Sequence, residues 1–191
     1  MLVELADILR GAGLATVEVT GWRTRGLTPM VSVKGIVIHH TSGRPQGDFP
    51  SLRLVRDGQD DLTGPLSQLG LGRTGIWYVI AAGRANHAGK TIDDSLYGNS
   101  HAIGIEAENT GVPLTDMGHA HWPEVQYQSY IRGVKALQAA YSVPTSRVRG
   151  HKEVAIPAGR KTDPNFSMAE FRAALASTRK YAYYAIFSVK L

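Results

Sequence analysis

Two segments that lie far apart in the chain constrain its fold most strongly, because each carries residues that could share one site. Residues 36–41 read IVIHHT, a short β-branched run that predicts a buried strand ending at His39 and His40. His151 follows a glycine much later, and Asp163 comes twelve positions after it in a loop rich in proline and glycine. A strand end and a loop that folds back can bring two imidazoles and one carboxylate to a single metal ion.

The residue types favour a catalytic metal site over a structural one. Structural zinc sites use four protein ligands, usually with thiolates, and this chain contains no cysteine. Three protein ligands leave one position for water, whose pKa zinc lowers from about 15.7 to about 7, and zinc also polarises a carbonyl. We therefore expect one Zn²⁺ ion and hydrolysis of an amide.

Strand alternation limits which side chains can reach such an ion. Neighbouring strand residues face opposite ways, so only one of His39 and His40 should point at the metal, and spacing does not say which. A second predicted strand, residues 102–108, has aliphatic residues at positions 103, 105 and 107. Glu106 lies on the other face, which makes it a candidate catalytic acid or base.

The whole pattern predicts a single α/β domain. The 191 residues are 43% hydrophobic and 19% charged, which suits one globular domain with a substantial core. Periodicity predicts helices near residues 2–9, between Pro123 and Pro144, and near 167–178, and strands near 15–19, 34–39, 76–81 and 102–108. Residues 43–72 read as a long loop containing a short helix.

We expect a catalytic domain over residues 1–178, in which residues 1–30 form a helix–strand extension. Residues 179–191 form an apolar, aromatic tail of unknown role. This tail could be a strand docked on the core, the start of a linker or a cloning artefact.

Charge and hydropathy limit the classes of partner that the protein can bind. A net charge of +5 favours polyanions such as nucleic acid, anionic lipid or a phosphate-bearing cell wall. The basic residues are scattered, without the dense run typical of nucleic-acid surfaces, so we expect no nucleic-acid partner. No apolar stretch reaches the ~20 residues of a membrane helix, and the N-terminus lacks the pattern of a signal peptide. We expect neither membrane insertion nor export by a signal sequence.

Three blocks of sequence, residues 36–41, 100–106 and 150–164, together resemble the zinc-dependent N-acetylmuramoyl-L-alanine amidases of type 2. This family includes amidase-type phage lysozymes, bacterial muropeptide amidases and peptidoglycan recognition proteins, and the resemblance covers roughly residues 30–175. It implies an α/β fold with a mixed central sheet, helices on both faces and a zinc-containing groove at the edge of the sheet.

The resemblance also implies a role for individual residues. His39, His151 and Asp163 would be the zinc ligands, with Asp163 in place of the cysteine found in another branch. Lys161 would stabilise the tetrahedral oxyanion, and Glu106 would act as the general base.

Other positions depart from the family pattern or match its substrate cleft. Several relatives carry a catalytic tyrosine where this chain has Ile76, and Tyr78 is a poor substitute if alternation points it away. Asn86 and His87 resemble the cleft segment, with Asn86 replacing an aromatic residue. We expect these two residues and His40 to contact substrate.

The reaction implied is cleavage of the amide between N-acetylmuramic acid and L-alanine in peptidoglycan. Residues 75–83 and 99–111 look most like endolysins of phages that infect actinobacteria. Such a bacteriolytic, antimicrobial enzyme would act as a monomer, accumulate in the cytoplasm and reach the wall through a holin pore. The alternatives are a cytoplasmic amidase that recycles anhydro-muropeptides and a non-catalytic peptidoglycan-binding module. Retention of all three ligands argues against the binding module.

Overall fold

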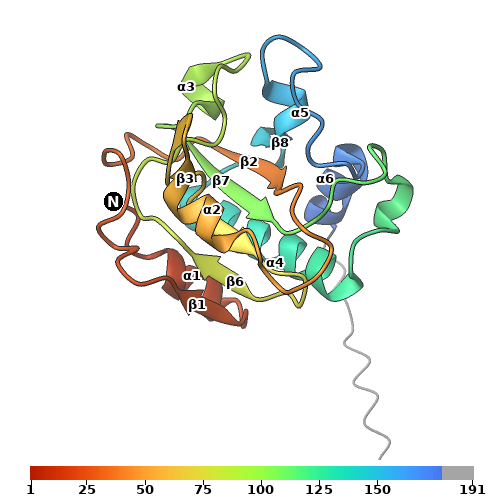
Figure 1. Cartoon of the computed structure of the whole chain (residues 1–191), viewed down its shortest axis with the longest axis horizontal. Coiled ribbons are helices and arrows are strands. Elements are labelled where there is room, and N and C mark those ends of the chain that lie inside the picture. The colour runs from red at the N-terminus through yellow and green to blue at the C-terminus, as the bar shows by residue number, and fades with distance from the viewer. Residues whose placement is uncertain (178–191) are drawn as a thin grey trace, which may run out of the picture.

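A six-stranded mixed sheet runs through the middle of the molecule in a computed structural model that describes residues 1–177 (Figure 1). The sheet order is β1-β6-β5-β7-β2-β8. The strands are β1 (Thr16–Glu18), β2 (Gly35–His40), β5 (Leu69–Leu71), β6 (Trp77–Val79), β7 (Ala102–Ala107) and β8 (Val148–Gly150). Strands β5 and β6 pair antiparallel, and the other neighbouring pairs are parallel. The predicted mixed sheet is confirmed.

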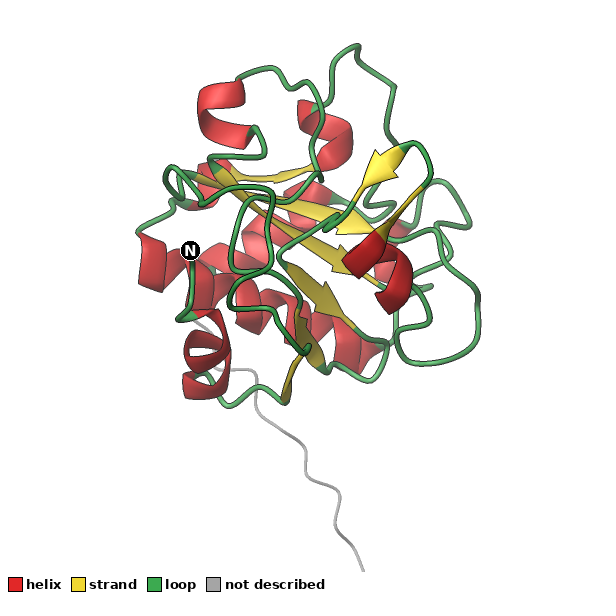
Figure 2. Cartoon of the chain, turned by 60° about the vertical axis from the view of Figure 1, so that its left-hand side comes forward, coloured by secondary structure: helices red, strands yellow, loops and turns green. Residues whose placement is uncertain are grey.

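Helices cover both faces of this sheet, as Figures 1 and 2 show. One face carries α1 (Leu5–Gly11), α4 (Glu124–Tyr141) and α6 (Met168–Ala176), and the other carries α2 (Leu52–Asp57), α3 (Asp94–Tyr97) and α5 (His151–Val154). Short 3₁₀ turns lie at Met117–His119 and Thr145–Arg147. No helix within residues 1–177 has the length and apolar character needed to cross a membrane.

Alternation along the strands separates a large core from the face that bears the candidate site. Ile36 and Ile38 of β2 join the main core with Leu5, Leu9 and the apolar side of α4, whereas Val37 belongs to a smaller cluster under α3 and α5. Because His39 follows Ile38, it faces the same side as Val37. The candidate site residue His39 therefore lies on the face of the sheet that the short helices α2, α3 and α5 cover.

The N-terminal residues are built into this arrangement. Helix α1 supplies Leu5 and Leu9 to the main core, and β1 pairs in parallel with β6 at the edge of the sheet. The predicted helix–strand extension thus contributes to the same sheet and the same core. The predicted tail, residues 179–191, lies outside the described residues.

The segment 43–72 differs from the expected loop with one helix. Besides α2, it contains a small hairpin of β3 (Gly58–Gln59) and β4 (Leu62–Thr63), and its last residues form the interior strand β5. Strand β5 has only three residues, too few for alternation to be recognised in the sequence. Its Gly70 is required because the Phe49 ring occupies the space that a Cβ would take.

Candidate metal and catalytic site

Parallel pairing of β2 with β8 brings the two predicted ligand histidines together. Ile38 lies opposite Gly150 in this pair. The next residue on each strand is a histidine, His39 on β2 and His151 at the start of α5. Carboxyl ends of parallel strands meet at the same edge of the sheet, so the two imidazoles become neighbours. Their ring centroids are 4.5 Å apart.

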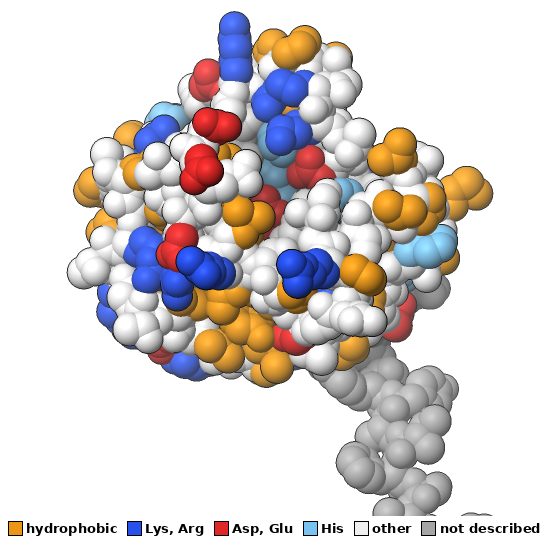
Figure 3. All heavy atoms as spheres, in the orientation of Figure 1, with side chains coloured by type: hydrophobic (Ala, Val, Ile, Leu, Met, Phe, Trp, Pro, Cys, Tyr) orange, Lys and Arg blue, Asp and Glu red, His pale blue; other side chains and the backbone are white. Residues whose placement is uncertain are grey.

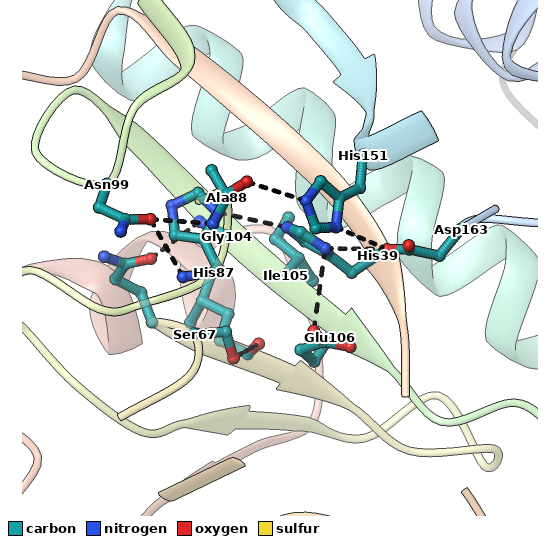
Figure 4. A network of polar contacts seen from close by, with 12 residues as sticks. His39, Ser67, His87, Ala88, Asn99, Gly104, Ile105, Glu106, His151 and Asp163 are labelled. Carbon is teal, nitrogen blue, oxygen red and sulfur yellow. Dashed lines mark hydrogen bonds and ion pairs between the residues drawn. The ribbon is translucent and has the colours of Figure 1, made fainter. Parts of the chain in front are cut away.

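Asp163 completes this group from the loop between α5 and α6. Its Oδ2 lies 3.0 Å from Nδ1 of His39 and 3.2 Å from Nδ1 of His151 (Figure 4). Its carbonyl accepts a hydrogen bond from the Lys152 N–H, which holds the returning loop against α5. Within residues 1–177, His39, His151 and Asp163 form the one group of potential ligands whose donor atoms all lie within 4.8 Å of one another.

The chemistry of these donors fits a divalent cation. Nε2 of His151 lies 3.0 Å from the carbonyl oxygen of Ala88, which can only accept a hydrogen bond. Nε2 therefore carries the proton in the neutral ring, and Nδ1 presents a lone pair to the Asp163 carboxylate. A lone pair and a carboxylate oxygen 3.2 Å apart repel each other, so the contact becomes favourable only when a proton or a metal cation lies between them. Two imidazoles and one carboxylate form a known catalytic zinc ligand set.

The ionisation of two of these groups also suits metal binding. Burial lowers the pKa of His39 to about 4, and the nearby His151 contributes to the decrease. Burial alone would raise the pKa of Asp163, but the adjacent His151 and His39 hold it below the usual range. At neutral pH the protein thus presents a neutral imidazole at His39 and a charged carboxylate at Asp163, which are the forms that bind metal.

Glu106 lies beside this group, because β7 pairs with β2 and places Glu106 opposite His39. Oε1 of Glu106 is 3.8 Å from Nδ1 of His39. Its Oε2 is buried and has no hydrogen-bond partner among the described residues. Burial raises the pKa of Glu106 well above its usual range, the Asp163 charge adds to this rise, and Lys161 opposes it.

Lys161 is exposed on the loop that carries Asp163. It lies close enough to influence the pKa of both Glu106 and His39 through its positive charge. The site is hollowed at the surface, and Figure 3 shows histidine and acidic side chains at the floor of the hollow with lysine or arginine side chains beside it. The positive charge of Lys161 therefore lies at the edge of a buried site formed by imidazole and carboxylate groups.

His40 and Tyr78 point away from this centre. His40 is buried, and its Nδ1 accepts a hydrogen bond from the Asn165 N–H, 3.3 Å away. Of the two adjacent histidines, the structure therefore brings only His39 to Asp163. The hydroxyl of Tyr78 donates to Oδ2 of Asp48 at 2.7 Å, and so does not face the cluster.

Asn86 and His87 take two different positions. The side chain of Asn86 is half-buried and donates to the carbonyl of Thr63 at 2.9 Å. His87 is buried behind His39, with its Nδ1 3.2 Å from Nε2 of His39. Burial, together with the neighbouring His39, lowers the pKa of His87 well below its usual value.

Two groups at the site could not be predicted from the sequence. The Ala88 carbonyl contacts His151, but a backbone atom has no sequence signal of its own. The hydroxyl of Tyr130 on α4 donates to the carbonyl of Ile105 at 2.9 Å and contacts the backbone of His39. Tyr130 matches the apolar period of α4, so its polar contact with the ends of two strands could not be read from spacing.

Comparison with known families assigns this fold and site to a class. The sequence model of the N-acetylmuramoyl-L-alanine amidases matches residues 29–166. The chain therefore belongs to the N-acetylmuramoyl-L-alanine amidase family, in its type 2 form.

Solved structures share the fold. An endolysin amidase, LysCS from Clostridium intestinale, is 21% identical, covers 84% of this chain and 94% of its own, and has a TM-score of 0.59. A selenomethionine derivative of AmpD is 25% identical over 85% of this chain and 94% of its own, with a TM-score of 0.57. AmiD from E. coli was solved in complex with anhydro-N-acetylmuramic acid-L-Ala-D-gamma-Glu-L-Lys. It is 21% identical, and the match covers 80% of this chain and 61% of AmiD, with a TM-score of 0.58. Comparison with curated protein sequences gives no match.

Proposed function

We propose that this protein is a zinc hydrolase that cleaves the amide between N-acetylmuramic acid and L-alanine in peptidoglycan. The observation that carries the proposal is the convergence of His39, His151 and Asp163, with Glu106 beside them. Zinc bound by these three residues would lower the pKa of water and polarise the scissile carbonyl. Residues 1–178 would form the catalytic domain.

The protein's own side chains would handle the protons and charge of the reaction. Glu106 would take a proton from the attacking water and deliver it to the departing amine of L-alanine, a role supported by its position and its unpartnered Oε2. Lys161 would stabilise the negative charge that develops on the carbonyl oxygen of the scissile amide. Its place on the loop that carries Asp163 supports this role. Asn86, whose side chain is partly exposed, would contact substrate.

The biological role that we propose is that of a phage endolysin acting on the intact wall. Support comes from the fold shared with LysCS, described as an endolysin amidase, and from a net charge of +5 that suits an anionic envelope. Such an enzyme would be made in the cytoplasm and reach the wall through a holin-type pore. The AmiD complex with an anhydro-muropeptide favours a second candidate, an amidase that acts on small soluble fragments.

A comparison of two substrates tests both candidates. The zinc-loaded protein is incubated separately with intact sacculi and with soluble anhydro-muropeptides. The amount of L-alanine α-amino group freed by cleavage is measured for each substrate. We expect faster release from sacculi. Preference for the soluble fragments would replace the endolysin role with fragment recycling. Asp163→Ala serves as the inactive control. If the wild type binds sacculi tightly but releases no more amine than Asp163→Ala, the hydrolase proposal is contradicted and a binding module is favoured.

A further inference from the structure

The segment of residues 86–89 contacts both ligand histidines from behind. Nδ1 of His87 lies 3.2 Å from Nε2 of His39, and the carbonyl of Ala88 lies 3.0 Å from Nε2 of His151. In each histidine this is the nitrogen that faces away from Asp163 (Figure 4). The same short segment therefore supports both imidazoles.

Hydrogen-bond chemistry determines where the protons of this chain of contacts lie. Nε2 of His87 faces the carbonyl oxygen of Ala102 at 3.1 Å, and a carbonyl can only accept. The neutral His87 ring must then carry its proton on Nε2 and present a lone pair at Nδ1. That lone pair accepts from Nε2–H of His39, so Nδ1 of His39 keeps its lone pair and faces Asp163. If His87 instead carried its proton on Nδ1, the lone pair of its Nε2 would face the carbonyl oxygen of Ala102, and two acceptors would meet.

The surrounding structure holds the segment in this position. The side-chain oxygen of Asn99 accepts hydrogen bonds from the N–H groups of His87 and Ala88, at 3.1 and 2.9 Å. The His87 ring lies against Gly104 of β7, where a Cβ would meet the ring. Arg160 also donates to the Ala88 carbonyl at 3.1 Å. The contacts involve backbone and side-chain groups from three parts of the chain, which is what an accurately placed support requires.

We propose that His87 is a positioning residue for the metal site: by accepting a hydrogen bond from Nε2–H of His39, it directs the Nδ1 lone pair of His39 toward the cation. The inference rests on the proposed metal site. It replaces the expectation that His87 contacts substrate, because the ring is buried between His39 and β7. Outer partners of metal-bound histidines set the tautomer and orientation of the ring, and their loss weakens metal affinity by about 10–100-fold.

Zinc affinity in a pair of variants of nearly equal size tests the proposal. His87→Asn keeps an acceptor at the δ position, whereas His87→Leu fills a similar volume without one. Zinc dissociation constants are measured by competition with a chromogenic chelator. We expect His87→Asn to bind within a few-fold of the wild type, and His87→Leu to bind about 10–100-fold more weakly. The same two changes at His101, which contacts Ser32 instead, should leave zinc affinity unchanged.

Each result has a distinct meaning. Equal zinc affinity of His87→Leu and the wild type would overturn the positioning role while leaving the proposed function intact. A wild-type protein that binds no zinc would overturn the metal site itself. Equal loss in both His87 variants would assign the effect to packing and so reject the proposal.

A second measurement is made on the wild-type protein and does not depend on how the His87 variants fold. The ¹⁵N shifts of histidine side chains in the metal-free wild type distinguish the two neutral tautomers, with His39 identified from the signal lost in His39→Asn. We expect the proton of His39 on Nε2. A His39 ring with its proton on Nδ1 would contradict the proposal.

Discussion

Glu106 and Glu108 are two carboxylates near the same strand end with opposite surroundings. Glu108 is buried and accepts hydrogen bonds from Thr41 and Ser51. Glu106 leaves Oε2 without a partner among residues 1–177. A buried acceptor without a partner is costly for stability, so its presence beside three potential metal ligands is consistent with a chemical role.

Replacing Glu106 with Gln should remove proton transfer while preserving the size of the side chain. We expect kcat to fall by about 10²–10⁴-fold, because a carboxamide cannot take a proton from water. Zinc affinity should stay close to that of the wild type. The measurement is amine release from sacculi together with zinc titration, with Glu170→Gln on α6 as an exposed control. Wild-type turnover in Glu106→Gln would show that another group is the base.

Lys161 provides a prediction of a different kind, because its side chain is exposed. Removing its charge in Lys161→Ala should cost about 3 kcal/mol of transition-state stabilisation, which lowers turnover by roughly a hundredfold. Stability and zinc affinity should hardly change. Turnover and thermal unfolding are compared with Lys90→Ala, an exposed lysine of a neighbouring segment. Equal turnover in the two variants would remove Lys161 from the mechanism.

At the scale of elements, Glu108 connects the end of β7 to the segment that follows β2. Its carboxylate accepts from Oγ1 of Thr41 at 2.8 Å, and from the N–H and Oγ of Ser51, both at 3.0 Å. Arg73 lies 3.8 Å away. Ser51 precedes α2, so one carboxylate links two strand ends and a helix.

Glu108→Gln should therefore destabilise the protein. The new amide group would face donors, and buried groups left without partners cost about 1–3 kcal/mol each. We expect the free energy of unfolding in urea to fall by about 2 kcal/mol, and by about 1 kcal/mol in Ser51→Ala, which loses a single side-chain bond. If Glu108→Gln is as stable as the wild type, this network does not hold the segment.

At the scale of the whole molecule, zinc binding should be coupled to folding, because the three ligands come from segments that meet only in the native structure. A ligand that binds only the folded state at 100 times its Kd stabilises it by about 2.7 kcal/mol. For a chain of this size, Tm should rise by roughly 5–10 °C with zinc. A chelator should reverse the rise.

Asp163→Ala is the control for this coupling. Its Tm should not respond to zinc, since one of three ligands is missing. An equal rise in the variant, measured by the same thermal scan, would place zinc binding elsewhere on the protein.

Much of the architecture could be predicted from local pattern. The apolar period of α4 and the β-branched runs of β2 and β7 indicated their structure, because each depends on residues close in sequence. Strand β5 was missed, since three residues are too few to show a period and its interior position depends on pairing with β6 and β7.

The sequence by itself determined which chemical groups were available: two histidines, one aspartate before a proline, a glutamate on the polar face of a strand, and no thiol. Residue spacing left open which of His39 and His40 faces the metal, although the family resemblance implied His39; the tertiary structure places His39 against Asp163 and puts His87 behind His39. Side-chain type and strand alternation are local properties. Which two nitrogens meet, and which of them carries the proton, depends on contacts between residues that are dozens of positions apart.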